Sequence, residues 1–229
     1  MQSYHSHPLN RIFLGLTILV AMINLWLIYQ VAPLVVDQEM AQKIFYYHVP
    51  LAWNAFLAFG LVAVTAALYL VKNDPKWDIW SLAGAEVGVL FAALILVTGP
   101  IWATPIWGKP WSWEPRLTTT LVLFLIFLGY FMVREFGGPY ERSSRYAAVI
   151  GLLAVIDIPL ILLAVKWWTP EVQSHPQMEM GNQPSAVLYV FFFSLFSFTL
   201  ILIHMIRYRW HVRRLVHSNL MEQEGGSHV

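Results

Sequence analysis

The sequence predicts an all-α, polytopic membrane protein with six transmembrane helices, and three observations lead to this fold class. Apolar residues make up 58% of the 229 residues and charged residues only 12%, whereas a soluble domain usually carries about 25% charged residues. The apolar residues occur in long runs, and Lys and Arg are unevenly distributed among the stretches between them. Helices are expected because open sheet edges cannot be satisfied in lipid.

Six of these runs can cross a bilayer, because a helix needs about 20 apolar residues to span the hydrocarbon core. Trimmed at glycine, proline and polar flanks, they predict spans near residues 12–32, 50–71, 79–99, 117–134, 146–166 and 185–206. The first is interpreted as a retained helix, since it is too long for a signal peptide. The chain, 1–229, is predicted to form a single membrane domain, in which residues 207–229 are a basic cytoplasmic tail.

The positive charges predict the orientation, because cytoplasmic loops carry an excess of Lys and Arg. With the N-terminus inside, ten cations face the cytoplasm: Arg11, Lys72, Lys76, Arg134, Arg142, Arg145, Arg207, Arg209, Arg213 and Arg214. Four face outward: Lys43, Lys109, Arg116 and Lys166. The opposite orientation inverts this ratio, so both termini are predicted to be cytoplasmic. The tail would then bind anionic lipid or a cytoplasmic partner.

Several chemistries are excluded or unsupported by residue content. The chain has no cysteine, which excludes disulfides, thiolate metal sites and cofactors attached through cysteine. The sequence contains no evident nucleophile–base pair and no phosphate-binding loop. An enzyme, ATP hydrolysis and a nucleic-acid partner are therefore not expected.

The predicted outer loop between the third and fourth spans is unusually rich in tryptophan. Trp102, Trp107, Trp111 and Trp113 occupy twelve residues. An aromatic belt at the membrane interface explains scattered tryptophans, but it explains a dense cluster in one loop poorly. The alternative is a platform for a large, flat, apolar ligand. Because prolines at 100, 105, 110 and 115 interrupt the segment, we expect short helical pieces or turns on the membrane surface rather than one continuous helix.

Two loop cations in this segment are candidates to bind ligand carboxylates. Lys109 and Arg116 flank the last tryptophans, and a guanidinium presents a planar fork to a carboxylate. The ordinary alternative is that both are loop-end cations, one of them paired with Glu114.

Two of the eight histidines, His48 and His175, are predicted to face outward. The other six lie on or near the inner side: His5, His7, His204, His211, His217 and His228. Taken singly, each outward histidine is an ordinary loop residue. Taken together with the tryptophan segment on the same face, they could approach one planar metal complex from opposite sides, since histidine is a normal axial ligand of haem iron.

Two acidic residues, Glu86 and Asp157, fall within apolar runs. A charge at a helix centre costs about 2.5–3.5 kcal/mol on insertion scales, so each is expected to face the bundle interior. Structural pairing is the favoured interpretation and a proton or ion path the alternative. Asp157 precedes Pro159, which would open backbone carbonyls nearby.

The segment Trp107-Gly108-Lys109-Pro110-Trp111-Ser112-Trp113-Glu114-Pro115-Arg116 resembles the tryptophan-rich WWD signature of haem-handling proteins. Thr98-Gly99 and Trp102 also match. Within that superfamily, the length, the six spans and one outer histidine on each side of the signature resemble cytochrome c maturation protein C (CcmC), also called haem exporter protein C. Two positions depart from the usual pattern, since Glu114 stands where the family has Asp and Ala103 where it often has Gly.

This resemblance implies a haem-handling function in cytochrome c biogenesis at the bacterial cytoplasmic (inner) membrane. Haem b would be bound transiently as cargo beside Trp102, Trp107, Trp111, Trp113, Glu114, Arg116 and Lys109, with His48 and His175 as axial ligands. It would pass to the haem chaperone CcmE. The implied partners are the ABC transporter subunits CcmA and CcmB, the small membrane protein CcmD, and lipid.

Three alternatives stay open at this point. The CcsA-type subunit of the second maturation system shares the signature but is usually longer. A cytochrome b-type redox subunit usually places paired histidines inside facing spans, and spans two to five contain none in their interiors. A secondary transporter would have broken helices at the membrane midplane, for which Asp157 and Pro159 are the only indication.

Overall fold

The computed structural model describes residues 4–34, 38–167 and 183–226, and within these ranges the regular structure is helical. A short 3-10 turn, η1 (Tyr4–Ser6), precedes the first long helix. Two further short elements, η2 (Leu27–Val31) and η3 (Glu39–Ile44), lie on either side of the first connection. The α-helices are α1 (Pro8–Trp26), α2 (Phe45–Lys72), α3 (Pro75–Trp107), α4 (Pro115–Phe136), α5 (Tyr140–Ala154), α6 (Asp157–Trp167) and α7 (Ser185–Gly226).

Six helical segments are long and apolar enough to cross a membrane, in agreement with the prediction. They are Pro8–Val31, Glu39–Lys72, Pro75–Trp107, Pro115–Phe136, Tyr140–Ala164 and Ser185–Glu222. Most extend beyond the predicted ends, and α7 continues past residue 206 to Gly226 as one helix. The helices are longer because polar and proline residues that mark the edge of an apolar run do not by themselves end a helix.

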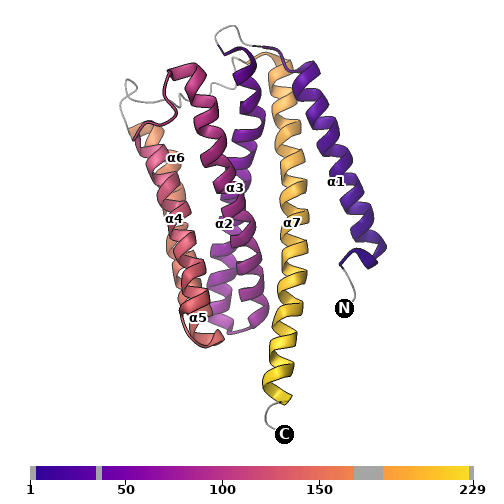
Figure 1. Cartoon of the computed structure of the whole chain (residues 1–229), viewed down its shortest axis with the longest axis vertical. Coiled ribbons are helices and arrows are strands. Elements are labelled where there is room, and N and C mark those ends of the chain that lie inside the picture. Colours follow the sequence, from indigo (N-terminus) through magenta and orange to yellow (C-terminus); the bar gives the residue numbers. More distant parts are fainter. Residues whose placement is uncertain (1–3, 35–37, 168–182, 227–229) are drawn as a thin grey trace.

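The helices form an elongated bundle around α2 and α3 (Figure 1). The helices α4, α5 and α6 lie on one side of this pair, and α7 lies on the other, with α1 packed against α7. The α2–α3 and α4–α5 turns lie at one end, toward which the first residues of α1 and the last residues of α7 also point. The start of α2, the end of α3 and the start of α4 lie at the opposite end, called here the upper end as in Figure 1.

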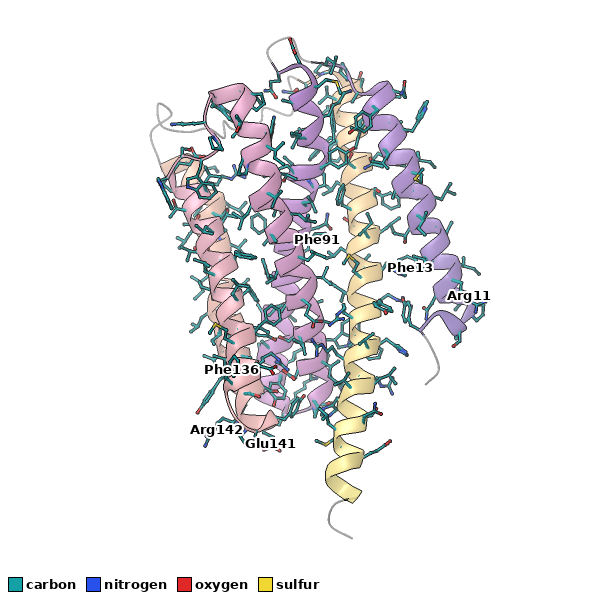
Figure 2. All side chains as sticks on the ribbon, viewed as in Figure 1. Arg11, Phe13, Phe91, Phe136, Glu141 and Arg142 are labelled. Carbon is teal, nitrogen blue, oxygen red and sulfur yellow. The ribbon has the colours of Figure 1, made fainter. Side chains whose placement is uncertain are left out.

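Small residues let α2, α3 and α4 pack closely in the bundle centre. A Cβ atom on Gly88 of α3 would lie 2.6 Å from Cε1 of Phe59 on α2, so glycine is required there. The Phe59 ring is fully buried and stacks on Phe127 of α4, with ring centroids 4.1 Å apart. Figure 2 shows Phe91 of α3 in the same central region, whereas Glu141 and Arg142 lie at the lower end.

Ion pairs hold the lower half of the bundle together. The Asp78 carboxylate on α3 is buried and accepts two hydrogen bonds of 2.7 Å from Arg134 on α4, and the Tyr140 hydroxyl of α5 donates a third, of 2.8 Å. Glu86 on α3 pairs with Arg209 at 2.6 Å and also with Arg213, both on α7. The structural interpretation of Glu86 therefore agrees with the structure.

The fifth span is broken where the sequence placed an acidic residue before a proline. Pro159 has no N–H to donate to the Val155 carbonyl, and the amide of Ile158 bonds that carbonyl instead, at 3.1 Å. This break separates α5 from α6. Asp157 lies at the break, and its buried Oδ2 has no hydrogen-bond partner among the described residues. The expected pairing of Asp157 is thus absent from the described part of the chain.

The tryptophan segment differs from its predicted form. The prolines were expected to prevent one continuous helix, but α3 runs without interruption through Pro100 and Pro105 to Trp107, and only residues 108–114 lack helical structure. Each proline removes one backbone bond, and membrane helices tolerate this because nearby groups satisfy the carbonyls. Pro105 leaves the carbonyl of Ile101 without its usual amide donor, while the carbonyl of Thr104 still accepts a hydrogen bond of 3.0 Å from the amide of Gly108. The helix ends at Gly108, with φ of 71°, a left-handed conformation that glycine adopts without strain.

Candidate functional site at the tryptophan-rich end

The upper end of the bundle brings together His48, the tryptophan segment and Glu114. His48 lies in the first turn of α2, and Trp102 lies near the end of the neighbouring helix α3. Glu114 precedes the first residue of α4 as its N-terminal cap residue. Since α2 and α3 are antiparallel neighbours, residues 50 positions apart in sequence meet at this end.

His48 is held between α2 and α3. Its side chain is buried, and its Nδ1 lies 2.9 Å from the Thr98 hydroxyl oxygen. Its ring meets the Trp102 indole edge to face, with centroids 5.7 Å apart. A Cβ atom on Gly99 would lie 3.4 Å from His48 Cε1, at van der Waals contact, which shows that the imidazole lies directly against α3.

The start of α2 is anchored by the η2 segment and by α7. Lys43, in η3, is buried and donates hydrogen bonds of 2.7 and 2.5 Å to the carbonyl oxygens of Ile28 and Ala32. Phe45 stacks on Phe191 of α7, with ring centroids 5.3 Å apart. These contacts limit the freedom of the turn that carries His48. Lys43 was predicted only as an outward-facing cation, and its anchoring contacts depend on the tertiary structure.

Three of the four predicted tryptophans line one hollow. Trp102, Trp107 and Trp111, together with Lys109, line a shallow hollow that is open to the surface. Trp102 and Trp107 lie 6.4 Å apart between ring centroids. The indole N–H groups of Trp102 and Trp111 are buried and have no hydrogen-bond acceptor among the described residues. The hollow is thus lined by apolar ring faces, and two of the residues that line it carry buried indole donors.

The remaining predicted residues lie around the hollow. Trp113 is 75% exposed and packs edge to face against Trp111, with centroids 5.7 Å apart. Glu114 is buried, and Arg116, in the first turn of α4, interacts electrostatically with its carboxylate. Lys109 is exposed at the mouth. These four residues therefore lie at the rim of the hollow or support it.

His175 lies outside the described residues, so the structure does not test its predicted position beside the hollow. Among the described residues no group of three or more His, Asp or Glu side chains could hold a metal ion. The site therefore lacks an ordinary carboxylate or multi-histidine metal centre in the part of the chain that is described. It offers one buried imidazole, indole faces and cations at the mouth, a set suited to a flat, anionic, apolar ligand.

Thr98 and Gly99 were noted only as part of the signature, and their contact with His48 was not foreseen. The feature of the sequence that could have indicated the contact between Thr98 and His48 is weak. Thr98 is a polar residue near the end of an apolar run, four positions before Trp102, and residues at this spacing share one face of a helix.

Comparison with known protein families gives a clear result. The family model described as "CcmC: Heme exporter protein C" matches residues 3–223, nearly the whole chain.

Individual relatives agree with this match. A protein of the liverwort Marchantia polymorpha described as "Putative cytochrome c biosynthesis ccmC-like mitochondrial protein" is 32% identical over 182 residues, which cover 80% of this chain and 75% of the relative. The heme exporter protein C of Bradyrhizobium diazoefficiens is 36% identical over 64% of this chain and 56% of its own length. The protein of the same name from Escherichia coli K12 is 30% identical over 67% of this chain and 63% of its own length. The aligned region thus spans between about half and three quarters of these relatives.

Proposed function

Because this chain belongs to the heme exporter protein C (CcmC) family, we propose that it holds haem at the outer membrane face and delivers it to the chaperone CcmE during cytochrome c biogenesis. The family match favours this over the CcsA-type, cytochrome b-type and transporter alternatives. In this proposal haem is the cargo of a transport and maturation component. The partners are CcmA and CcmB, which supply the ATP-driven step, and CcmD.

One observation carries the proposal: a buried imidazole packs directly against a tryptophan that lines the hollow. The His48 and Trp102 rings lie 5.7 Å apart, and the same indole forms one wall of the hollow. A flat ligand seated against Trp102 would therefore lie beside the residue that packs on His48, although His48 itself does not line the hollow. Histidine is a normal axial ligand of haem iron.

We assign the other residues by their chemistry and place. Trp102, Trp107 and Trp111 supply apolar contact for the porphyrin, and Trp113 extends it at the surface. Lys109 and Arg116 bind the propionates, and Glu114 holds Arg116 in place. His175 supplies the second axial ligand, which gives a six-coordinate iron suited to a holding site. Transfer then requires one ligand to yield, and His175 is assigned this role because His48 is fixed by its packing between α2 and α3.

The location is proposed from the charge distribution and the relatives. With both termini cytoplasmic, the hollow opens toward the outer side of the bacterial cytoplasmic membrane. Anionic lipid headgroups on the inner side bind the basic residues of the tail.

The test is the visible absorption spectrum of the purified, haem-loaded full chain. Removing either ligand, by His48→Ala or His175→Ala, should open one axial position. The low-spin bis-histidine spectrum should then be lost, and added imidazole should restore it. His217→Ala is the matched control, since His217 lies at the lower end beside Tyr140, with ring centroids 4.9 Å apart; its spectrum should equal that of the wild type. If both single ligand variants keep the low-spin spectrum without imidazole, the ligand assignment is wrong.

A further inference from the structure

A chain of two hydrogen bonds runs from His48 to the backbone of α3. The His48 Nδ1 lies 2.9 Å from the Thr98 hydroxyl oxygen. That hydroxyl lies 2.8 Å from the carbonyl oxygen of Leu94, one turn earlier, and 3.4 Å from that of Ile95. Both groups beyond the hydroxyl are backbone carbonyls.

The sequence of imidazole, hydroxyl and carbonyl assigns the protons of His48 and Thr98. A carbonyl oxygen can only accept a hydrogen bond, so the 2.8 Å separation from the Leu94 carbonyl oxygen assigns the proton of the Thr98 hydroxyl to the backbone. The hydroxyl oxygen then accepts from His48, which places the imidazole proton on Nδ1. A neutral imidazole carries one ring proton, so Nε2 of His48 carries the lone pair.

We propose that Thr98 is a positioning residue that fixes His48 in the Nδ1–H tautomer, so that Nε2 is the atom that ligates haem iron. This inference rests on the proposed function, since it concerns how His48 would serve as a ligand. Metal-binding histidines commonly donate their other ring N–H to an acceptor, which fixes the ring orientation and raises the basicity of the ligating nitrogen. Here the acceptor is a hydroxyl that is itself oriented by the helix backbone.

The surroundings reinforce the same orientation. Trp102 meets the imidazole edge to face, and Cε1 of the imidazole lies close to Gly99 on α3. Packing therefore limits the tilt of the ring, while Thr98 selects which nitrogen faces the helix. Packing alone could not distinguish the two tautomers, because they have the same shape.

The test compares three substitutions in α3 of the full chain. Thr98→Val keeps the β-branched shape and removes the hydroxyl, whereas Thr98→Ser keeps the hydroxyl. Thr104→Val is the matched control, because the Thr104 hydroxyl makes the equivalent bond to the Pro100 carbonyl, at 2.8 Å, on an exposed face of the same helix. Loss of a helix-backbone bond alone would affect Thr98→Val and Thr104→Val alike.

Two measurements on the haem-loaded protein report on the ligand. We expect haem b to bind about 10–100-fold more weakly to Thr98→Val, the usual effect of losing such a supporting group. The midpoint potential should shift upward, because a less basic imidazole stabilises ferric iron less. Thr98→Ser and Thr104→Val should both remain close to the wild type.

A third measurement needs no haem. In the haem-free protein with ¹⁵N-labelled histidine, the His48 signals, identified by their absence in His48→Ala, should show a protonated Nδ1 and an unprotonated Nε2. Thr98→Val should lose this pattern. A protonated Nε2 in the wild type, or haem affinity and potential in Thr98→Val equal to those of Thr104→Val, would overturn the proposal.

These outcomes are separable from failure of the proposed function. If His48→Ala keeps the bis-histidine spectrum, His48 is not a ligand, whatever its tautomer. If His48→Ala loses that spectrum and Thr98→Val is unchanged, the ligand assignment stands and Thr98 has no positioning role.

Discussion

The tryptophans of the upper end differ in their surroundings from those elsewhere in the chain. Trp102, Trp107 and Trp111 line the hollow and are partly covered by one another and by neighbouring residues. Trp26 and Trp53, by contrast, are 59% and 51% exposed on the outside of the bundle, where lipid would surround them. The same residue type thus occupies a candidate ligand site in one place and a lipid-facing surface in another.

Substitution should separate these two roles. Trp111→Leu removes an indole face from the hollow together with an N–H donor that has no acceptor among the described residues. We expect it to loosen haem and lower cytochrome c yield, whereas Trp26→Leu should leave both unchanged. Haem retention on purification and cytochrome c yield in cells are the measurements. Wild-type values for Trp107→Leu, Trp111→Leu and Trp113→Leu alike would support the lipid-belt interpretation instead.

At the scale of elements, α3 determines how the site is built. Its lower half pairs with α4 through Asp78 and with α7 through Glu86, and its upper end carries Thr98 and Trp102 to His48. A continuous helix is stiff along its length, because most of its residues are hydrogen-bonded to the next turn. The close packing of α2 on α3 in between therefore sets where His48 and Trp102 meet.

Gly88 offers a test of this packing. A Cβ atom in Gly88→Ala would lie 2.6 Å from the fully buried ring of Phe59, which is stacked on Phe127 and has no space to move. We expect the substitution to destabilise the protein by about 1–3 kcal/mol, the usual cost of overpacking a core. The midpoint of thermal unfolding in detergent or nanodiscs measures it.

Gly60→Ala is the control for this prediction. Gly60 is adjacent to Phe59 on α2, but a Cβ atom there would meet nothing within 4 Å. Because alanine favours a helix over glycine by about 0.8–1.0 kcal/mol, Gly60→Ala should be neutral or stabilising. Equal stability of the two variants would show that α2 and α3 can separate more easily than their packing indicates.

At the scale of the whole molecule, the six helices that can cross a membrane would place both termini on one side of it. The loop that carries the tryptophan segment lies at the opposite end of the bundle from the last residues of α7 (Figure 1). Ion pairs connect α3 to helices on both sides, so the lower end is held by charges and the upper end by aromatic packing. The orientation relative to the cytoplasm is predicted from the cations alone.

The chain contains no cysteine, so single cysteines can report this orientation directly. In intact cells a membrane-impermeant thiol reagent should label Ser112→Cys, at the tryptophan-rich end. Ser218→Cys, on the projecting part of α7, should react only after the membrane is permeabilised. Labelling of Ser218→Cys in intact cells, with Ser112→Cys protected, would reverse the predicted topology.

The six apolar runs, their helical form and the family could be recognised from the sequence alone. These are local properties, since the length of an apolar run and the composition of one loop can be recognised without knowing any contact. The WWD-like segment and the two histidines predicted to face outward were identified in the same way, because they are sets of residue types at definite positions. The extent of α3 through Pro100 and Pro105 was predicted wrongly, because proline statistics do not include the carbonyl partners that a membrane bundle supplies.

Which of these residues contact one another depends on the packing of the helices. The Thr98 hydroxyl contacts His48, which lies 50 positions away in sequence. Glu86 pairs with Arg209, which lies 123 positions away. Such contacts depend on how six similar apolar helices pack, and many packings bury comparable apolar area. The choice among them comes from small residues such as Gly88, which permit one close approach and exclude others, and from the few polar groups that must find partners within the bundle.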